Sequence, residues 1–397
     1  MLDADVAIVG AGAAGLSLAH RLSSPVGGGR RPVVALVDAP PGPLRPPRRT
    51  WCFWERDDGA YEAAVTASWQ RLAVHDTQGR TAAGCIAPLR YKMIRSDDFE
   101  ALVRRELAAR PGVRRIEAAV DAVRDVPGGA EVHGTTAGGE PVTVAARWVF
   151  DSRPLGILPA ARTTLLQHFR GWFVRTERPA FDPQEVRLMD FRTPQPSHGL
   201  SFGYVLPTGR RTALVEYTEF SAAPLSTDAY EAALRHYTQD VLGLGGLSVT
   251  GTETGVIPMT DAPFARQAGP AVFRIGAAGG ATRPSTGYTF AAVQRQTGAI
   301  AAAYRAGRRP VPPPPHAARS RAMDSVLLRA LDTGRVDGAD FFARLFRRVP
   351  LERLLRFLDG RTRLYEDLAI GLHTPVLPML RTVAELPLLP RRPFPRP

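Results

Sequence analysis

Strand-like apolar runs alternate with helical patterns near the start of the chain. Residues 6–9 form an apolar run of strand type, residues 16–22 have the composition of a small-residue helix, and residues 33–37 form a second apolar run. Residues 91–109 then contain a strand that enters a helix with apolar positions at helical spacing. Alternating strands and helices are typical of a parallel sheet with helices on its faces.

The middle of the chain has a different pattern. Residues 113–144 alternate strand-like segments with glycine-rich turns, which predicts a small antiparallel layer, and residues 148–153 form another apolar strand. From about 163 to 260 strand-like runs recur, with one clear helix predicted over 227–244. These runs lie at residues 171–176, 187–191, 201–206 and 212–217. The region therefore predicts a mixed or antiparallel sheet inserted into the first domain.

The last part of the chain returns to the first domain and then becomes helical. Residues 271–276 form an apolar run of strand type, and a helix is predicted after them. Beyond the proline-rich spacer at 310–315, residues 323–389 predict several amphipathic helices rich in Leu, Phe and Arg. Two interpretations stay open for these helices, because they can cover the core or lie against a membrane surface.

Three glycines mark the turn between the first strand and its helix. Gly10, Gly12 and Gly15 have G-x-G-x-x-G spacing. Ala14 lies within the motif, and Asp38 ends the strand that follows. Gly10 permits the turn, Gly12 lets the backbone approach a pyrophosphate, and Gly15 lets the helix pack closely on the strand. The helix N-terminus favours phosphate, and Asp38 is placed to bind a ribose. The alternative is a glycine-rich turn in an ordinary α/β sheet.

Other positions are candidates for the same ligand. Arg95 lies where a strand meets its helix, so its charge can contact a phosphate or be solvated. Asp151 ends a strand at the edge of the sheet where ligands bind. A second small-residue turn runs from Gly276 to a helix that begins at Gly287 and Tyr288. Two such turns favour a cofactor longer than a mononucleotide, which points to FAD.

The predicted fold class follows from these patterns. It is α/β, with a Rossmann-like FAD-binding domain, an inserted mixed or antiparallel β-sheet substrate domain and a C-terminal helical region. The predicted boundaries are 1–162 and 261–310 for the FAD-binding domain, 163–260 for the substrate domain and 316–397 for the helical region.

Composition and charge narrow the function classes. The chain has 397 residues, of which 44% are hydrophobic, and a formal net charge of +13. Its basic residues are dispersed, which argues against nucleic acid as the partner and favours an anionic membrane surface. Cys52 and Cys85 are the two cysteines, so neither a disulfide framework nor a metal site is predicted. With neither a signal peptide nor a membrane span expected, the predicted location is cytoplasmic, peripheral on the inner face of the cell membrane.

Two acidic residues are candidates for chemistry. Asp190 and Glu216 both lie at the ends of apolar strands, where a carboxylate would be partly buried. The alternative is a surface or hydrogen-bonded carboxylate that closes its strand. The aromatic residues Trp51, Phe53 and Trp54 follow a proline-rich loop, and they either fill the core beneath it or line a cleft.

Several ordered stretches of the chain resemble one enzyme family. They are DVAIVGAGAAGLSLAHRL, RTWCFWE, YKMIRSDDFEALV, VFDSRP, LQHFRGWFV, LMDFR, GYVLPTGRRTALVEYTEFS and GAAGGATRPSTGYTF. The chain resembles the flavin-dependent lycopene β-cyclases of bacteria, cyanobacteria and plants, which are relatives of the aromatic-hydroxylase flavoproteins. The resemblance implies a membrane-associated enzyme that cyclises an apolar polyene, lycopene, with reduced FAD and without net oxidation. NAD(P)H normally reduces the flavin in this family.

The resemblance also assigns roles to particular residues. It implies that Glu216 is the essential acid, as the first glutamate of the family's Phe-Leu-Glu-Glu-Thr motif. The second acidic position is Tyr217 here, so a relay of two carboxylates at that point is in doubt. Asp190 and Arg192 match the family's Met-Asp-Trp-Arg stretch, and both are candidate catalytic residues.

Two further positions bear on the flavin. Gly287 and Tyr288 match a Thr-Gly-Tyr turn that packs beside the flavin in the family. The related hydroxylases carry a Gly-Asp pair where this chain has Gly276 and Ala277, and this departure speaks against a hydroxylase.

The resulting hypothesis is protonation of an alkene by a buried Glu216, with an anionic reduced flavin and aromatic faces stabilising the carbocation. Two other classes stay open. One is a flavin monooxygenase or reductase that acts on another terpenoid or lipid, which would consume oxygen and NAD(P)H as product forms. The other is a non-catalytic basic binder of membrane or nucleic acid, which would show no flavin spectrum.

Overall fold

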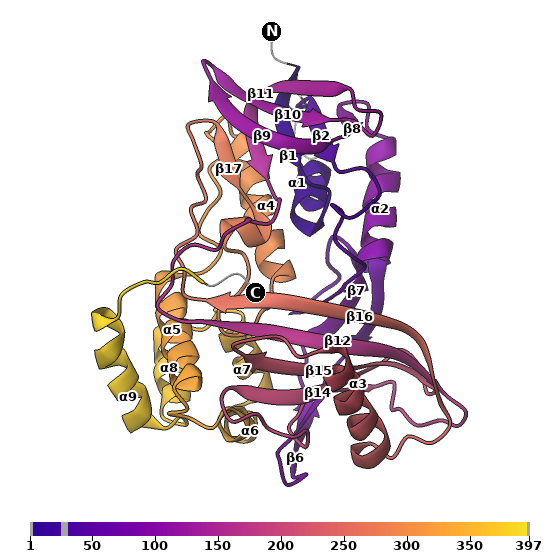
Figure 1. Ribbon diagram of the computed structural model, residues 1–397, viewed down its shortest axis with the longest axis vertical. Coiled ribbons are helices and arrows are strands. Elements are labelled where there is room, and N and C mark those ends of the chain that lie inside the picture. Colours follow the sequence, from indigo (N-terminus) through magenta and orange to yellow (C-terminus); the bar gives the residue numbers. More distant parts are fainter. Residues whose placement is uncertain (1–2, 25–30, 395–397) are drawn as a thin grey trace.

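Two large sheets, a small sheet and a group of C-terminal helices make up the computed structural model, which describes residues 3–24 and 31–394 (Figure 1). The first large sheet lies at the top of this view and the second at the bottom. The predicted fold class, an α/β Rossmann-like domain with an inserted sheet and C-terminal helices, is confirmed.

The first large sheet has the strand order β8-β2-β1-β11-β10-β9, and β17 also pairs with β11. Strands β2, β1 and β11 are parallel neighbours, and β9 and β10 add the predicted antiparallel layer. The strands are β1 (Ala4–Val9), β2 (Val34–Asp38), β8 (Val113–Glu117), β9 (Ala119–Val126), β10 (Gly129–Thr135), β11 (Pro141–Asp151) and β17 (Val272–Arg274). The predicted strand over 271–276 is thus shorter than its apolar run.

Both faces of β1 are buried, which explains its continuous apolar run. Val6 and Ile8 pack with helices on one face, whereas Ala7 and Val9 pack beneath the antiparallel layer on the other. The helices on the first face are α1 (Ala13–Ser23), α2 (Ser96–Ala108) and α4 (Phe290–Arg305). Helix α4 begins at Phe290, slightly later than predicted.

The second large sheet is mixed and has the order β16-β12-β15-β14-β13-β5-β6. Its strands are β5 (Arg71–His75), β6 (Thr81–Cys85), β12 (Thr164–Thr176), β13 (Glu185–Asp190), β14 (Leu200–Pro207), β15 (Thr212–Ser221) and β16 (Leu247–Thr260). Strands β5 and β6 come from the range predicted as the first domain, so the inserted sheet draws on residues outside 163–260. A small sheet of β3 (Thr50–Glu55), β4 (Val65–Trp69) and β7 (Arg90–Arg95) has β7 at its centre.

Helices cover both faces of the second sheet. Helix α3 (Thr227–His236) packs on one face and continues as a π-helical turn over Tyr237–Val241, so the predicted helix over 227–244 changes geometry before its end. The other face packs against the C-terminal helices α5 (Ala318–Asp332), α6 (Gly338–Arg348) and α7 (Leu351–Leu358). The candidate acid Glu216 lies on this second face, with Leu214 two residues before it on the same strand.

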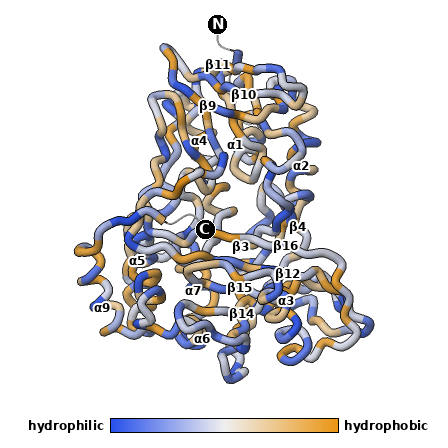
Figure 2. The backbone as a smooth tube through the Cα atoms, in the orientation of Figure 1, coloured by the Kyte–Doolittle hydropathy of each residue, from blue (hydrophilic) through white to orange (hydrophobic). Residues whose placement is uncertain are grey.

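The last two helices lie at the edge of the molecule. They are α8 (Leu364–Gly371) and α9 (Val376–Glu385), and α9 forms the outer left edge of the view (Figure 1). Hydrophobic and hydrophilic residues are interleaved along this edge (Figure 2). Among the described residues, no helix has both the length and the apolar character needed to cross a bilayer.

Candidate active site

The first glycine turn leaves open space at the N-terminus of α1. Gly10 has a φ of 91°, and a Cβ on Gly15 would lie 1.8 Å from the carbonyl oxygen of Gly10, so neither position accepts a side chain. At Gly12 a Cβ would meet nothing within 4 Å. The backbone amides at the start of α1 therefore face room for an anionic group.

The acids predicted beside this turn lie at its edge. Asp38 accepts a hydrogen bond from the Ala11 amide at 3.0 Å, and its other oxygen lies 3.3 Å from Arg45. Asp151, at the end of β11, is paired with Arg153 at 2.8 Å. Both carboxylates thus lie at the carboxyl ends of the two strands that flank β1, and Asp38 also fixes the backbone of the turn.

The second predicted turn meets the first one. Gly276 has a φ of 65°, and a Cβ there would lie 2.9 Å from the Cβ of Ala14, so glycine lets this segment pack directly against α1. Gly287, with a φ of 71°, approaches the side chain of Gln167 on β12 in the same way. The structure therefore brings the two small-residue turns together.

A buried ion pair holds the loop between these glycines. Arg283 donates to Asp324 of α5 at 3.1 Å, and the Ser285 hydroxyl donates to the same carboxylate at 2.7 Å. Burial raises the pKa of Asp324, and the contact with Arg283 opposes that rise. Helix α5 thereby positions the loop that carries Tyr288.

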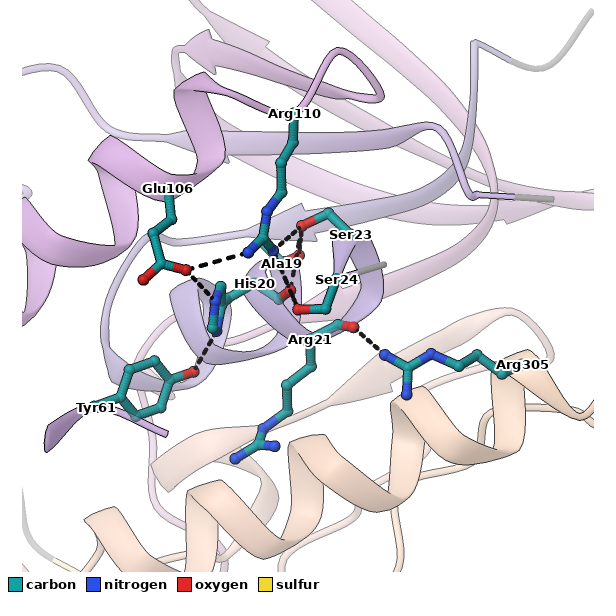
Figure 3. Close-up of polar contacts among 9 residues, drawn as sticks. All are labelled: Ala19, His20, Arg21, Ser23, Ser24, Tyr61, Glu106, Arg110 and Arg305. Atoms are coloured by element: carbon teal, nitrogen blue, oxygen red, sulfur yellow. Dashed lines mark hydrogen bonds and ion pairs between the residues drawn. The ribbon is translucent and has the colours of Figure 1, made fainter. Parts of the chain in front are cut away.

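A polar network holds α1 against its neighbours (Figure 3). The ring of His20 contacts the Tyr61 hydroxyl at 3.2 Å and the Glu106 carboxylate at 2.7 Å. Arg110 donates to Ser23 at 2.9 Å and also reaches Glu106. Burial lowers the pKa of His20, which favours the neutral ring. The network fixes the helix whose N-terminus faces the glycine turn.

A cavity of about 480 Å³ lies between the loop and the second sheet. Its walls come from four places: the segment before and within β3, Tyr91 of β7, the loop from Ala277 to Phe290, and the sheet face formed by β12, β14, β15 and β16. Among the described residues, the buried Gln167 Oε1 and Thr286 Oγ1 in its wall have no hydrogen-bond partner. Unpaired buried oxygens of this kind are suited to a polar ligand.

Aromatic and aliphatic side chains make up much of the remaining wall. Tyr288 lies 3.1 Å from the Tyr91 hydroxyl and 3.5 Å from the Tyr204 hydroxyl, oxygen to oxygen. Trp51 stacks on Phe290 with ring centroids 5.5 Å apart and lines the cavity. The aliphatic lining residues are Leu206, Leu214, Val256, Ile257 and Pro258. Of the predicted aromatic cluster, Trp51 therefore lines the cleft, whereas Phe53 and Trp54 are core residues.

Glu216 points into this cavity. It is 9% exposed and accepts a hydrogen bond from the Thr218 hydroxyl at 2.6 Å. Burial and the nearby negative charge of Glu253 raise the pKa of Glu216 to about 8. The carboxyl is therefore protonated at neutral pH, as a proton donor to a weak base requires.

Glu253 is a site residue that the sequence analysis missed. It lies on β16 and lines the same cavity, and it accepts a hydrogen bond from the Thr50 hydroxyl at 2.7 Å. Its signal in the sequence was weak, since the strand around it is polar and partly exposed. Tyr217, which stands at the family's second acidic position, packs on the opposite face of the sheet because adjacent strand residues alternate.

The other predicted catalytic pair lies away from the cavity. Asp190 and Arg192 form an ion pair at 2.5 Å, and the Tyr237 hydroxyl donates to Asp190 at 3.0 Å. Tyr237 belongs to the π-helical turn on the far face of the sheet. The structure does not bring this pair to Glu216, and we infer that it stabilises the opposite face.

Arg95 lies at the predicted junction, as the last residue of β7 directly before α2. Its guanidinium lies over the ring of Phe173 on β12, 4.9 Å from the centroid. Burial raises the pKa of Glu253, and the positive charge of Arg95 opposes that rise. Arg95 thus lies on the carboxylate side of the site.

The family model for "Lycopene cyclase protein" matches residues 5–384. A search of curated proteins gave no match. Among solved structures, the chain is similar to a geranylgeranyl bacteriochlorophyll reductase-like protein of Thermoplasma acidophilum (TM-score 0.63, 13% identity, 96% of this chain and 99% of that chain). It is also similar to p-nitrophenol 4-monooxygenase PnpA of Pseudomonas putida (0.59, 13%, 98% and 98%) and to Klebsiella pneumoniae HpxO in complex with FAD and uric acid (0.58, 15%, 96% and 97%). At these identities the structures share the fold alone.

Proposed function

The chain belongs to the lycopene cyclase family, and we propose that it closes the ψ end groups of lycopene into β-ionone rings. The proposed reaction requires reduced FAD and causes no net oxidation or reduction. The observation that carries the proposal is a buried carboxyl, Glu216, with its pKa raised to about 8, in the wall of a largely apolar cavity beside the second glycine turn.

FAD fits the residues that surround the site. The open space at Gly12 suits the pyrophosphate. The contact of Gly276 with α1 brings the two glycine turns close enough for one elongated ligand to contact both. The unpaired Gln167 Oε1 and Thr286 Oγ1 offer polar contacts near the cavity. When bound in its reduced form, FAD would supply an electron-rich ring beside the cavity, and NAD(P)H is the proposed reductant.

Glu216 is the proposed acid. An alkene is a very weak base, so the acid must keep its proton until contact and must be shielded from water. Burial among apolar side chains meets both conditions. Transfer of the Glu216 proton to a terminal alkene carbon of lycopene would let the end of the polyene close into a ring and leave a tertiary carbocation.

The same residues can complete the reaction. Tyr204 and Tyr288 line the cavity, and their aromatic rings would stabilise positive charge. The aliphatic wall would exclude water, which otherwise traps the cation as an alcohol. The Glu216 carboxylate would then accept the proton lost from the neighbouring carbon, so the protons balance and the acid is restored.

Anaerobic incubation with lycopene and chemically reduced FAD, followed by chromatography, tests this function. We expect ring-containing product without consumption of reductant in step with product, and none when the flavin is left oxidised. A flavin monooxygenase or reductase would consume oxygen or NAD(P)H as product forms. A purified chain that binds no flavin, or one that leaves lycopene unchanged, would contradict the proposal.

The outer surface of α8 and α9 supports a membrane location for this activity. Leu364, Leu368 and Leu372 are exposed, the last at 75%. On the same helix Glu366 and Asp367 are buried against arginines, which reverses the usual arrangement of a surface helix. Four further apolar residues of the patch are exposed on α9: Val376, Leu377, Leu380 and Val383.

We infer that this patch inserts into the surface of a bilayer that contains anionic lipids. Arg381, Arg391 and Arg392 are exposed on α9 and just beyond it, and the net charge of +13 favours such lipids. An apolar polyene also has to reach the cavity from a lipid phase. The part of the chain that the structure describes offers no spanning helix, so contact would be peripheral.

A vesicle flotation assay tests the membrane contact. The variant that combines Leu368→Ser, Leu372→Ser, Leu377→Ser and Leu380→Ser is expected to lose at least about tenfold in binding to vesicles with anionic lipid. Wild-type binding should weaken in neutral vesicles and at high salt. Equal binding of variant and wild type, or dimerisation of the wild type through the patch in place of flotation, would contradict the inference.

A further inference from the structure

Two carboxylates approach each other across a strand that carries no side chain between them. Glu216 on β15 and Glu253 on β16 are both register partners of Gly171 on the intervening strand β12. Directly paired residues point to the same face of a sheet, so both side chains extend over Gly171 into the cavity.

Gly171 provides the space for this approach. A Cβ at this position would lie 2.8 Å from Leu214 Cδ1, 3.3 Å from Glu253 Cγ and 3.6 Å from Glu216 Cβ. Gly171 is not among the described glycines with positive φ, so the backbone conformation does not require glycine. Glycine is required here because the side chains of the two glutamates and Leu214 occupy the space that a Cβ would need.

The surroundings of the two carboxylates differ. Burial raises the pKa of both carboxyls, but Glu253 accepts the Thr50 hydroxyl at 2.7 Å, and the positive charges of Arg95 and Arg49 oppose the rise at Glu253. Glu216 has the Thr218 hydroxyl as its recorded hydrogen-bond donor and no arginine acting on it in the described structure. Negative charge is therefore favoured on Glu253 and the proton on Glu216.

We propose that Glu253 is a positioning residue whose carboxylate keeps Glu216 protonated by charge repulsion across Gly171. The inference deepens the proposed function and rests on it for the role of Glu216. The other titratable groups facing the pair are the Cys52 thiol and the hydroxyls of Tyr91, Tyr204 and Tyr288, which line the same cavity. Burial raises the pKa of each of these four, so they stay neutral near pH 7.

The test is an infrared titration of the protonated carboxyl of Glu216 in the purified full-length chain, assigned by its absence in Glu216→Gln. Glu253→Gln should move the titration midpoint down by about one to two pH units, because a like charge is removed. Glu253→Asp should keep the midpoint close to the wild-type value. The matched control is Glu219→Gln, which removes a buried carboxylate from the opposite face of the same strand and should leave the midpoint unchanged.

The pH profile of cyclisation provides a second readout. Activity requires protonated Glu216, so its decline with rising pH should begin at lower pH in Glu253→Gln. If this variant folds poorly, Thr50→Val should move both midpoints in the same direction by a smaller amount, since it weakens the charge on Glu253. An unchanged infrared midpoint in folded Glu253→Gln would overturn the inference even if lycopene is cyclised. A shifted midpoint in a protein that leaves lycopene unchanged would support the pair and overturn the proposed function.

Discussion

Two buried glutamates in this protein have opposite protonation behaviour. Glu216 in the cavity and Glu366 on α8 are 9% and 5% exposed, so their burial is similar. Glu366 accepts two hydrogen bonds from Arg356, at 2.6 and 3.0 Å, and the pKa of Glu366 is lowered to about 2. Glu216 faces another carboxylate instead, and its pKa is raised to about 8. At Glu216 burial is the largest cause of the rise, and the like charge of Glu253 adds to it, whereas at Glu366 the hydrogen bonds from Arg356 outweigh the effect of burial.

The two sites also show different uses of the same residue type. In the cavity, none of the described residues places a cation beside Glu216, so a proton stays available for chemistry. On α8, the ion pair with Arg356 holds the helix face that carries Glu366 toward the protein interior, so Leu368 and Leu372 face outward. One arrangement supplies an acid, and the other orients an apolar surface.

The largest expected effect comes from replacing the acid in the cavity, Glu216, by a side chain that cannot donate a proton. Glu216→Gln should reduce cyclisation by about 10²- to 10⁴-fold, the usual contribution of a general acid. Flavin absorbance should stay unchanged, and Glu219→Gln serves as the control on the opposite face of β15. Near-normal turnover in Glu216→Gln would refute the assignment of the acid.

Removing the cation at the other site should affect stability and not chemistry. Arg356→Met leaves Glu366 buried without its main partner, so the Tm should fall by several degrees. The double variant Arg356→Met/Glu366→Met should recover much of that loss, since no buried charge then remains unpaired. Differential scanning calorimetry measures both, and a double variant no more stable than Arg356→Met would argue against the pairing.

Filling the space above Gly171 should have a smaller effect. Gly171→Ala places a methyl group 2.8 Å from Leu214 Cδ1, so the neighbours must move, at about 1–3 kcal/mol of stability. Gly251→Ala is the matched control, because its methyl group would meet Phe173 at an ordinary 3.6 Å. Equal urea midpoints for the two variants would show that the space above Gly171 is not constrained.

The smallest effect over a single pH unit is a pair of opposite pH dependences. Between pH about 4.5 and 8 the native state keeps the Glu216 proton that the unfolded chain has lost, so stability should fall by up to about 1.4 kcal/mol per pH unit. Glu366 behaves in reverse, since its contribution is present above about pH 4.5 and is lost as the pH falls toward 2. Urea unfolding across pH should show the first slope reduced in Glu216→Gln and unaltered in Glu366→Gln.

The sequence by itself determined the features that depend on neighbours along the chain. The glycine spacing at residues 10–15 predicts a turn with space at Gly12, and the structure has that turn. Apolar periodicity predicted the positions of most strands. It also predicted that an α/β domain comes first along the chain and that a second sheet is inserted into it. Glu216 stood out because it ends an apolar run, and the resemblance carried by ordered motifs gave the family.

Tertiary structure decided which strands pair and which way side chains face. Glu253 lies 37 residues beyond Glu216, and only the pairing of β15 and β16 with β12 places both over Gly171. The pairing of β13 with β14 and β5 turned Asp190 toward Tyr237 and away from the cavity. Periodicity along a strand shows that side chains alternate between two faces, but it gives neither the register nor the partner strand. Contacts between distant segments, and the protonation states that depend on them, are therefore fixed only in the folded sheet.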